Sequence, residues 1–267
     1  MEQYASRHGV LPQREIASAR GAQTLLRGLN VIEAVADGEA SLGRLAERLE
    51  LNRSTVHRLA SALVERRYLS VSREAGYTLG PKLLELGFRA QREVDLVQVA
   101  RSHIVALALL TEDTVHLGVL DRDTALYLDK IAGRRRVNLR SEVGERQPLT
   151  STGLGKALML DLPPLYWAQR FKAEQGMAAY RARFAPWNRR MARYVAAGRA
   201  FDLEENEDQV RCVAAPLRGA GGRVVGAISV ASAAQYMDRA RMDRLGDVVR
   251  DCASTISREL GYFNART

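Results

Sequence analysis

The chain has 267 residues, of which 46% are hydrophobic and 27% are charged, and its formal net charge is +9 at pH 7. This length suits two domains with cores of ordinary size, and the basic balance is compatible with an anionic partner. The sequence contains no run of 18 apolar residues, so it predicts no membrane-spanning helix and no membrane partner.

Residues 1–20 are polar and mixed in charge, and they lack the apolar core of a secretion signal. They are predicted to form a flexible N-terminal arm, and the chain is expected in the cytoplasm. The two cysteines, Cys212 and Cys252, belong to no CxxC pair and to no histidine cluster. They indicate neither a disulfide framework nor a metal site, and we expect no cofactor.

The first predicted helix, Thr24–Ala36 (TLLRGLNVIEAVA), is amphipathic. Its inward residues are expected to be Leu25, Leu26, Leu29, Ile32 and Val35. A short helix over Leu42–Leu49 follows, with Ser41 as its N-cap, and it leads into a polar turn at Glu50–Asn52. Asn52 is a good N-cap for a further helix, because its side-chain oxygen can accept a free backbone N–H.

That further helix is predicted from Arg53 to about Arg67, within the stretch ELNRSTVHRLASALVERRYL. Apolar residues at helical spacing form one of its faces, namely Val56, Leu59, Ala60 and Leu63. The opposite face carries polar side chains near the N-terminal end, namely Ser54, Thr55, His57, Arg58 and Ser61. A recognition helix meets base edges and phosphates in the major groove with this end. By itself, the pattern also fits an amphipathic surface helix with a solvated polar face.

Two β-prone runs follow, Tyr68–Val71 and Tyr77–Leu79, with turn-forming residues between them. Three helices in about 45 residues followed by a hairpin are typical of a winged helix-turn-helix, which we place at residues 21–80. Its predicted DNA contacts are Arg53, Ser54, Thr55, His57, Arg58, Ser61 and, on the wing, Arg73. Residues 1–96 hold 14 Lys and Arg against 12 Asp and Glu, so this prediction depends on the motif and not on a basic patch.

A linker helix is predicted over residues 81–95, with Pro81 in its first turn. Residues 96–267 are predicted to form an α+β domain, in which helices flank an antiparallel sheet. The predicted strands are Thr114–Leu120, Thr124–Ile131, Val137–Arg140, Arg199–Asp202, Val210–Leu217 and Arg223–Ala231. The predicted helices are Leu96–Leu110, Gly153–Asp161, Pro164–Lys172, Trp187–Ala197 and Met237–Glu259.

No arrangement of catalytic residues stands out, so the sequence predicts no catalytic site and no enzyme. The run Thr150–Lys156 (TSTGLGK) has a single residue between its glycines, which is too short for a phosphate-binding P-loop. The acidic stretch Glu204–Asp208 fits a solvated or salt-bridged loop better than a cation site, and the basic run Arg134–Arg136 fits a solvated loop better than a second DNA contact. His116 is expected to be an ordinary polar-face histidine of a strand, and Cys212 a buried, inert thiol.

The start of the helix predicted at Gly153 has a small-residue sequence, Gly153-Leu154-Gly155, preceded by Thr150-Ser151-Thr152. A helix N-terminus presents free N–H groups, and glycine lets a ligand approach the backbone, so a small carboxylate would fit there. The other interpretation is an ordinary N-cap whose glycines serve packing.

From about Gln23 to Leu86 the chain resembles the DNA-binding domain of the IclR family of bacterial transcription regulators. The resemblance continues through TVHLGVLDRDTALYLDKI, VGERQPLTSTGLGKAL, FDLEENEDQVRCVAAPL and VVGAISVAS. It implies a GAF/PAS-like effector-binding and oligomerisation domain, whose pocket positions correspond here to Gly153, Leu154, Asp202, Val210, Cys212 and Ser229. The chain departs from relatives at Ala231, where some have serine, and at Leu154, where alanine is common.

Together these features predict an allosteric transcription regulator, a repressor of a carbon-catabolic operon, controlled by a small organic acid in the C-terminal domain. The expected partners are a near-palindromic double-stranded DNA operator, a sugar acid or keto acid, and further copies in a homodimer or homotetramer. The alternative is a small-molecule sensor or metabolic enzyme with an appended helix-turn-helix, which turnover of the bound ligand would reveal.

Overall fold

The computed structural model describes residues 22–135 and 139–263. The chain divides into two compact units between Glu93 and Val94. The predicted arm at residues 1–20 lies outside the described residues. None of the described helices is long and apolar enough to span a membrane.

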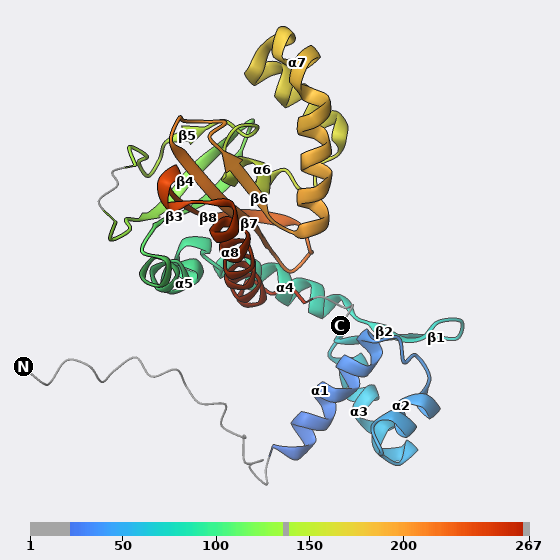
Figure 1. The fold of residues 1–267 in the computed structure, drawn as a ribbon. Helices are drawn as coiled ribbons and strands as arrows, with labels where there is room; N and C mark the ends of the chain where they lie inside the picture. The colour runs from blue at the N-terminus through green and yellow to red at the C-terminus, as the bar shows by residue number, and fades with distance from the viewer. Residues whose placement is uncertain (1–21, 136–138, 264–267) are drawn as a thin grey trace, which may run out of the picture. The chain divides into compact units, whose positions relative to one another are not determined.

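The N-terminal unit is a winged helix-turn-helix followed by a helix (Figure 1). Its elements are α1 (Gln23–Ala36), α2 (Leu42–Arg48), α3 (Arg53–Glu65), β1 (Leu69–Ser72), β2 (Gly76–Leu79) and α4 (Pro81–Glu93). The predicted caps are present, because Ser41 accepts a hydrogen bond from the Arg44 N–H and Asn52 accepts one from the Thr55 N–H. The antiparallel pair β1–β2 forms the wing.

The core of this unit corrects the predicted orientation of α1. Leu25, Leu26 and Leu29 are exposed, with relative accessibilities of 66%, 41% and 44%, whereas Val35 is buried as predicted and Ile32 is half-buried. Val31 and Ala34 are buried together with Val35. Both sets recur at helical spacing, so periodicity alone does not tell which stripe faces the core. The buried stripe packs in a cluster with residues of α2 and α3, among them Leu45 and Val56.

The C-terminal unit contains a six-stranded sheet, and every pair of neighbouring strands is antiparallel. The strand order is β5-β4-β3-β8-β7-β6. The strands are β3 (Thr114–Asp121), β4 (Thr124–Ile131), β5 (Arg146–Gln147), β6 (Ala200–Leu203), β7 (Val210–Arg218) and β8 (Val224–Ala233). The helices are α5 (Leu96–Thr111), α6 (Gly153–Leu158), α7 (Pro164–Ala197) and α8 (Arg239–Glu259), with a short 3-10 turn, Ala234–Tyr236, before α8.

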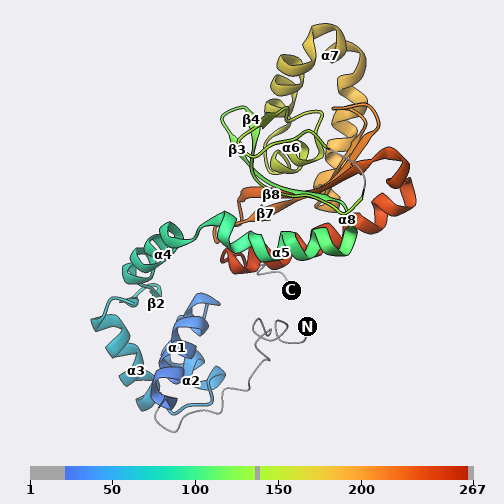
Figure 2. The same ribbon diagram turned by 90° about the vertical axis from the view of Figure 1, so that its left-hand side faces the viewer.

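The sheet is covered on both faces, and each face has its own core (Figure 2). Helices α5 and α8 pack on one face, where Val213 and Ile228 belong to the core. Helices α6 and α7 pack on the other, where Cys212 and Ala227 do. Adjacent residues of β7, Cys212 and Val213, therefore serve opposite cores, as the two-residue period of a strand requires. The predicted α+β class is confirmed.

Two predictions of secondary structure in this unit are corrected. The strand predicted at Val137–Arg140 is not formed by its described residues, and residues 136–138 lie outside the description. The short strand β5 stands later in the chain instead. The two helices predicted in the region of α7 are a much longer pair, which Gly176 separates with φ 82° and ψ 166°. The second segment runs through Pro186, although proline removes a helical hydrogen bond and predicts a helix start there.

Candidate functional site

The polar face of α3 is the first candidate site. Its side chains Arg53, Ser54, His57, Arg58 and Ser61 are exposed, and Thr55 is half-buried. The opposite side of the helix is buried through Val56, Leu59 and Ala60. The predicted wing residue Arg73 is also exposed, in the turn between β1 and β2. The structure therefore places all seven predicted DNA-contacting residues at least partly at the surface; their contact with DNA remains a prediction.

The N-terminal end of α3 is held by its cap. The Asn52 side-chain oxygen accepts hydrogen bonds from the Thr55 N–H at 2.8 Å and from the Ser54 hydroxyl at 2.9 Å. None of the ion pairs among the described residues involves Arg53, Arg58 or Arg73. These three guanidinium groups are thus available to an anionic partner.

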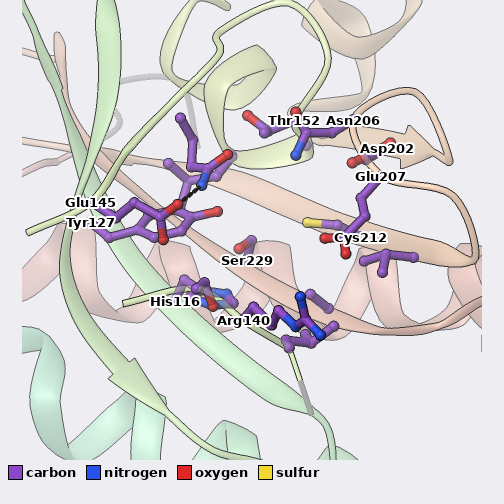
Figure 3. Close-up of a pocket in the computed structure, with 17 residues that line it drawn as sticks. His116, Tyr127, Arg140, Glu145, Thr152, Asp202, Asn206, Glu207, Cys212 and Ser229 are labelled. Atoms are coloured by element: carbon purple, nitrogen blue, oxygen red, sulfur yellow. Dashed lines mark hydrogen bonds between the residues drawn. The ribbon is translucent and has the colours of Figure 1, made fainter. Parts of the chain in front are cut away.

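The second candidate site is a cavity of about 180 Å³ in the C-terminal unit (Figure 3). All six residues predicted to bind an effector line it, namely Gly153, Leu154, Asp202, Val210, Cys212 and Ser229. They come from the start of α6 and from strands β6, β7 and β8. The strand register explains the grouping, because Asp202 pairs with Cys212, and Cys212 pairs with Ala231, two residues from Ser229. That these residues bind an effector remains a prediction.

The glycines at the start of α6 are explained by close packing. A Cβ atom on Gly153 would lie 2.8 Å from the sulfur of Cys212, and one on Gly155 would lie 2.5 Å from the Cα of Leu149. The Gly155 N–H already donates to the Thr152 hydroxyl at 3.0 Å. The six-residue helix therefore offers a ligand at most the N–H groups of Gly153 and Leu154, and the Leu154 N–H also interacts with the Cys212 thiol.

Asp202 and Cys212 form a buried polar wall. Asp202 accepts a hydrogen bond from the Glu205 N–H at 2.8 Å, and its burial raises its pKa to about 6. Burial likewise raises the pKa of the Cys212 thiol to about 12, so the thiol stays protonated at neutral pH. A protonated, buried thiol is a poor nucleophile, in agreement with the predicted inert role of Cys212.

A buried lysine holds the loop after β6 in place through hydrogen bonds and an ion pair. Lys156 is 1% exposed, and its ammonium group donates to the carbonyls of Ser151 and Phe201, each at 3.0 Å, and to the Glu205 carboxylate. Arg190 binds the same carboxylate. The acidic stretch Glu204–Asp208 is thus salt-bridged, as predicted, and no cluster of metal-binding side chains is found in the described part of the chain.

The basic run at residues 134–136 is partly described. Arg134 is exposed, Arg135 forms an ion pair with Asp113 at 2.9 Å, and Arg136 lies outside the described residues. The pairing of Arg135 with an acid of the same unit agrees with a structural role for that residue.

His116 is a cavity residue that the sequence interpretation missed. It is 3% exposed, stacks on Tyr127 with ring centroids 4.7 Å apart, and has its Nε2 2.7 Å from the Ser141 hydroxyl. Burial lowers its pKa to about 4, so the ring is neutral at pH 7. Strand alternation placed it on the correct face, but its cross-strand partner, Ser229, depends on a pairing of distant strands that the sequence alone does not specify.

Comparison with known proteins identifies both units. The IclR helix-turn-helix domain model matches residues 24–72, and the model of the bacterial transcriptional regulator IclR C-terminal domain matches residues 88–258. The chain is 30% identical over 251 residues to the DNA-binding transcriptional repressor YiaJ of Escherichia coli strain K12, covering 91% of this chain and 89% of that protein. It is 30% identical over 250 residues to the glycerol operon regulatory protein of Streptomyces coelicolor, covering 91% and 98%.

The fold has a solved counterpart over nearly the whole chain. The structure is similar to that of Pseudomonas aeruginosa HmgR, with a TM-score of 0.77 at 23% identity, over 92% of this chain and 100% of that one. The matched family models together span most of both units. The chain therefore belongs to the IclR family of bacterial transcription regulators, with an N-terminal DNA-binding domain and a C-terminal effector-binding domain.

Proposed function

We propose that this regulator represses a carbon-catabolic operon and that a small organic acid in the C-terminal cavity changes its affinity for DNA. The observation that carries the proposal is the convergence of Gly153, Leu154, Asp202, Val210, Cys212 and Ser229 on one cavity. The relatives support repression and the control of a carbon-catabolic operon, since one is a transcriptional repressor and another regulates a glycerol operon. Control of this kind requires unequal ligand affinity for two arrangements of the DNA-binding domains.

The domain assignment follows from the same proposal. Residues 21–80 bind DNA, residues 81–95 link the domains, and residues 96–267 bind the effector and oligomerise. The protein works as a homodimer or homotetramer in the cytoplasm, where it binds a near-palindromic operator with paired recognition helices.

The DNA side is tested with Arg58→Ala. Arg58 lies on the exposed face of α3 near its N-terminal end, and a base-reading side chain contributes about 1–3 kcal/mol of discrimination. The variant should bind operator at least several-fold more weakly, as measured by fluorescence anisotropy, with its fold checked by circular dichroism. Arg66→Ala removes the same charge at the other end of the helix and should weaken binding less. If both variants bind operator with the affinity of the wild type, α3 is not the helix that contacts the bases.

The effector side is tested with Asp202→Ala and Gly153→Val. The first removes a buried carboxyl from the cavity, and the second drives a side chain into Cys212. Operator binding is measured with and without a panel of sugar acids and keto acids. Both variants should lose the response to the acid that acts on the wild type. If both keep the wild-type response, the ligand binds elsewhere.

The same panel separates a regulator from an enzyme. The protonated Cys212 thiol and the neutral His116 ring supply no activated nucleophile to the cavity. We therefore expect the bound acid to be recovered chemically unchanged after prolonged incubation, as mass spectrometry would show. Turnover would support the metabolic-enzyme alternative.

A further inference from the structure

More acidic than basic side chains line the cavity. Its lining residues include three acidic ones, Glu145, Asp202 and Glu207, and one arginine, Arg140, which is exposed at the rim. In Figure 3, Asp202 and Glu207 lie near Cys212, and the Arg140 side chain extends from beside His116 into the same cavity. An anionic ligand in this cavity is therefore attracted by one lining side chain, and the attraction falls off with distance from it.

We propose that Arg140 binds the carboxylate of the effector, so that the hydroxylated end of the ligand lies toward Asp202 and the start of α6. This inference rests on the proposed function, because it concerns the ligand of the same cavity. It reverses the orientation suggested by the sequence, in which the carboxylate sits on the N–H groups of Gly153–Gly155.

The start of α6 is a poor place for a carboxylate in this chain. Its available N–H groups are those of Gly153 and Leu154. The backbone nitrogen of Asp202 is 3.3 Å from where a Gly153 Cβ would lie, so this residue, whose side chain is buried and lines the same cavity, adjoins the start of α6. Two carboxyl groups close together in a buried site cannot both stay ionised without a large electrostatic penalty. A ligand hydroxyl has no such penalty there, and it can donate a hydrogen bond to Asp202.

Arg140 is held at the cavity by its neighbours in the chain. The Lys130 ammonium group donates to the carbonyl of Leu139 at 2.8 Å and to that of Ser141 at 2.6 Å. The Ser141 hydroxyl is also hydrogen-bonded to His116. Lys130 and His116 are cross-strand partners in β4 and β3, so both fasten the Leu139–Ser141 segment to one point of the sheet. Lys130 is therefore a positioning residue for the Arg140 guanidinium.

His116 indicates which ligand group lies next to the carboxylate. Its Nδ1 is buried and has no hydrogen-bond partner among the described residues, although the ring lines the cavity. Burial keeps this ring neutral, with a pKa of about 4, so it supplies a neutral hydrogen-bonding group and no positive charge. A buried polar atom of this kind is normally satisfied in the functional state. The ligand class is thus a hydroxy acid, with a hydroxyl near its carboxylate that pairs with His116.

The test uses the full-length protein and matched ligand pairs that differ only in the acid group. Isothermal titration calorimetry compares D-gluconate with D-glucitol and D-glycerate with glycerol. The wild type should prefer the acid of at least one pair. Arg140→Ala should lower acid affinity at least tenfold and leave alditol affinity unchanged, because a charge-assisted contact is lost and the hydroxyl contacts remain. Arg140→Lys should restore part of the preference.

Two further variants separate positioning from general damage. Lys130→Met should reduce the preference for the acid in the same direction, because the Leu139–Ser141 segment loses two hydrogen bonds. Arg122→Ala, which removes an exposed arginine from the β3–β4 turn, should keep the wild-type preference. If Arg140→Ala binds the acid as the wild type does, the carboxylate lies elsewhere in the cavity and the assignment of Arg140 is overturned. If the wild type binds neither acid, the ligand is not a hydroxy acid of this kind, and the assignment of Arg140 as its carboxylate-binding residue is rejected as well.

Discussion

Asp202 is the residue at which burial and charge conflict most directly. It is 4% exposed, and its pKa rises from 3.8 to about 6, chiefly because burial penalises the charged carboxylate. The folded state therefore holds this proton more tightly than the unfolded state does. Below about pH 4 both states are protonated and no penalty exists. Between about pH 4 and 6 the penalty grows, and above pH 6 it is fully present.

Replacing Asp202 with asparagine should remove that penalty and keep an oxygen that can accept the Glu205 N–H. The melting temperature of Asp202→Asn, relative to wild type, should rise as pH increases from about 4 to 6, with a change in stability of up to ~3 kcal/mol. His116 also titrates in this range but is present in both proteins, so its contribution cancels. Asp251→Asn, at an exposed position, should show no such rise. A difference that does not vary with pH would mean that Asp202 ionises normally.

The residues of the cavity divide into those that the sequence predicts and those that it does not. Asp202 and Cys212 could be predicted because the family motif fixes them and strand alternation puts them on one face. His116 and Arg140 could not, because their position depends on which distant strands pair and on where an irregular segment lies. Local patterns specify the face of a strand, whereas pairing is a property of the whole sheet.

The prediction of helices from the sequence has a similar limit. The recognition helix was predicted almost to its ends because Asn52 marks its start and a polar face opposes an apolar one. In α1 two apolar stripes share Val35, which is buried as predicted, but Leu25, Leu26 and Leu29 are exposed and Val31 and Ala34 complete the buried stripe. In α7 the break lies at Gly176, where no sequence signal other than glycine marks it, while Pro186 lies inside the helix.

The break in α7 gives a prediction at the element scale. Gly176 has φ 82° and ψ 166°, a region that is essentially open to glycine alone. Gly176→Ala should therefore lower the free energy of unfolding by about 1–3 kcal/mol, measured as a lower urea midpoint. In an unbroken helix the same change would stabilise by up to ~1 kcal/mol, so an increase in stability would show that no break exists. Ala178→Gly, at an exposed helical position nearby, should be destabilising by only about 0.5–1 kcal/mol.

At the scale of the whole molecule, the net charge of +9 is a poor guide to where DNA binds. Residues 1–96 hold 14 Lys and Arg against 12 Asp and Glu, so most of the excess lies in the C-terminal part of the chain. The proposed DNA contacts are instead a few guanidinium groups without ion-pair partners among the described residues, on α3 and on the wing. Affinity should then reflect local phosphate contacts that are doubled by symmetry, and not attraction by the bulk charge.

Salt dependence tests this arrangement. If two recognition helices bind a near-palindromic operator, log affinity should fall steeply and linearly with log salt concentration. Arg73→Ala should reduce the slope by about one for each DNA-binding domain, hence about two for a dimer. Arg122→Ala, which removes an exposed charge from the C-terminal unit, should leave the slope unchanged. Light scattering should report a dimer or a tetramer in the absence of DNA. A monomer that binds a single half-site with full affinity would contradict the symmetric operator, because half of the phosphate contacts would then suffice.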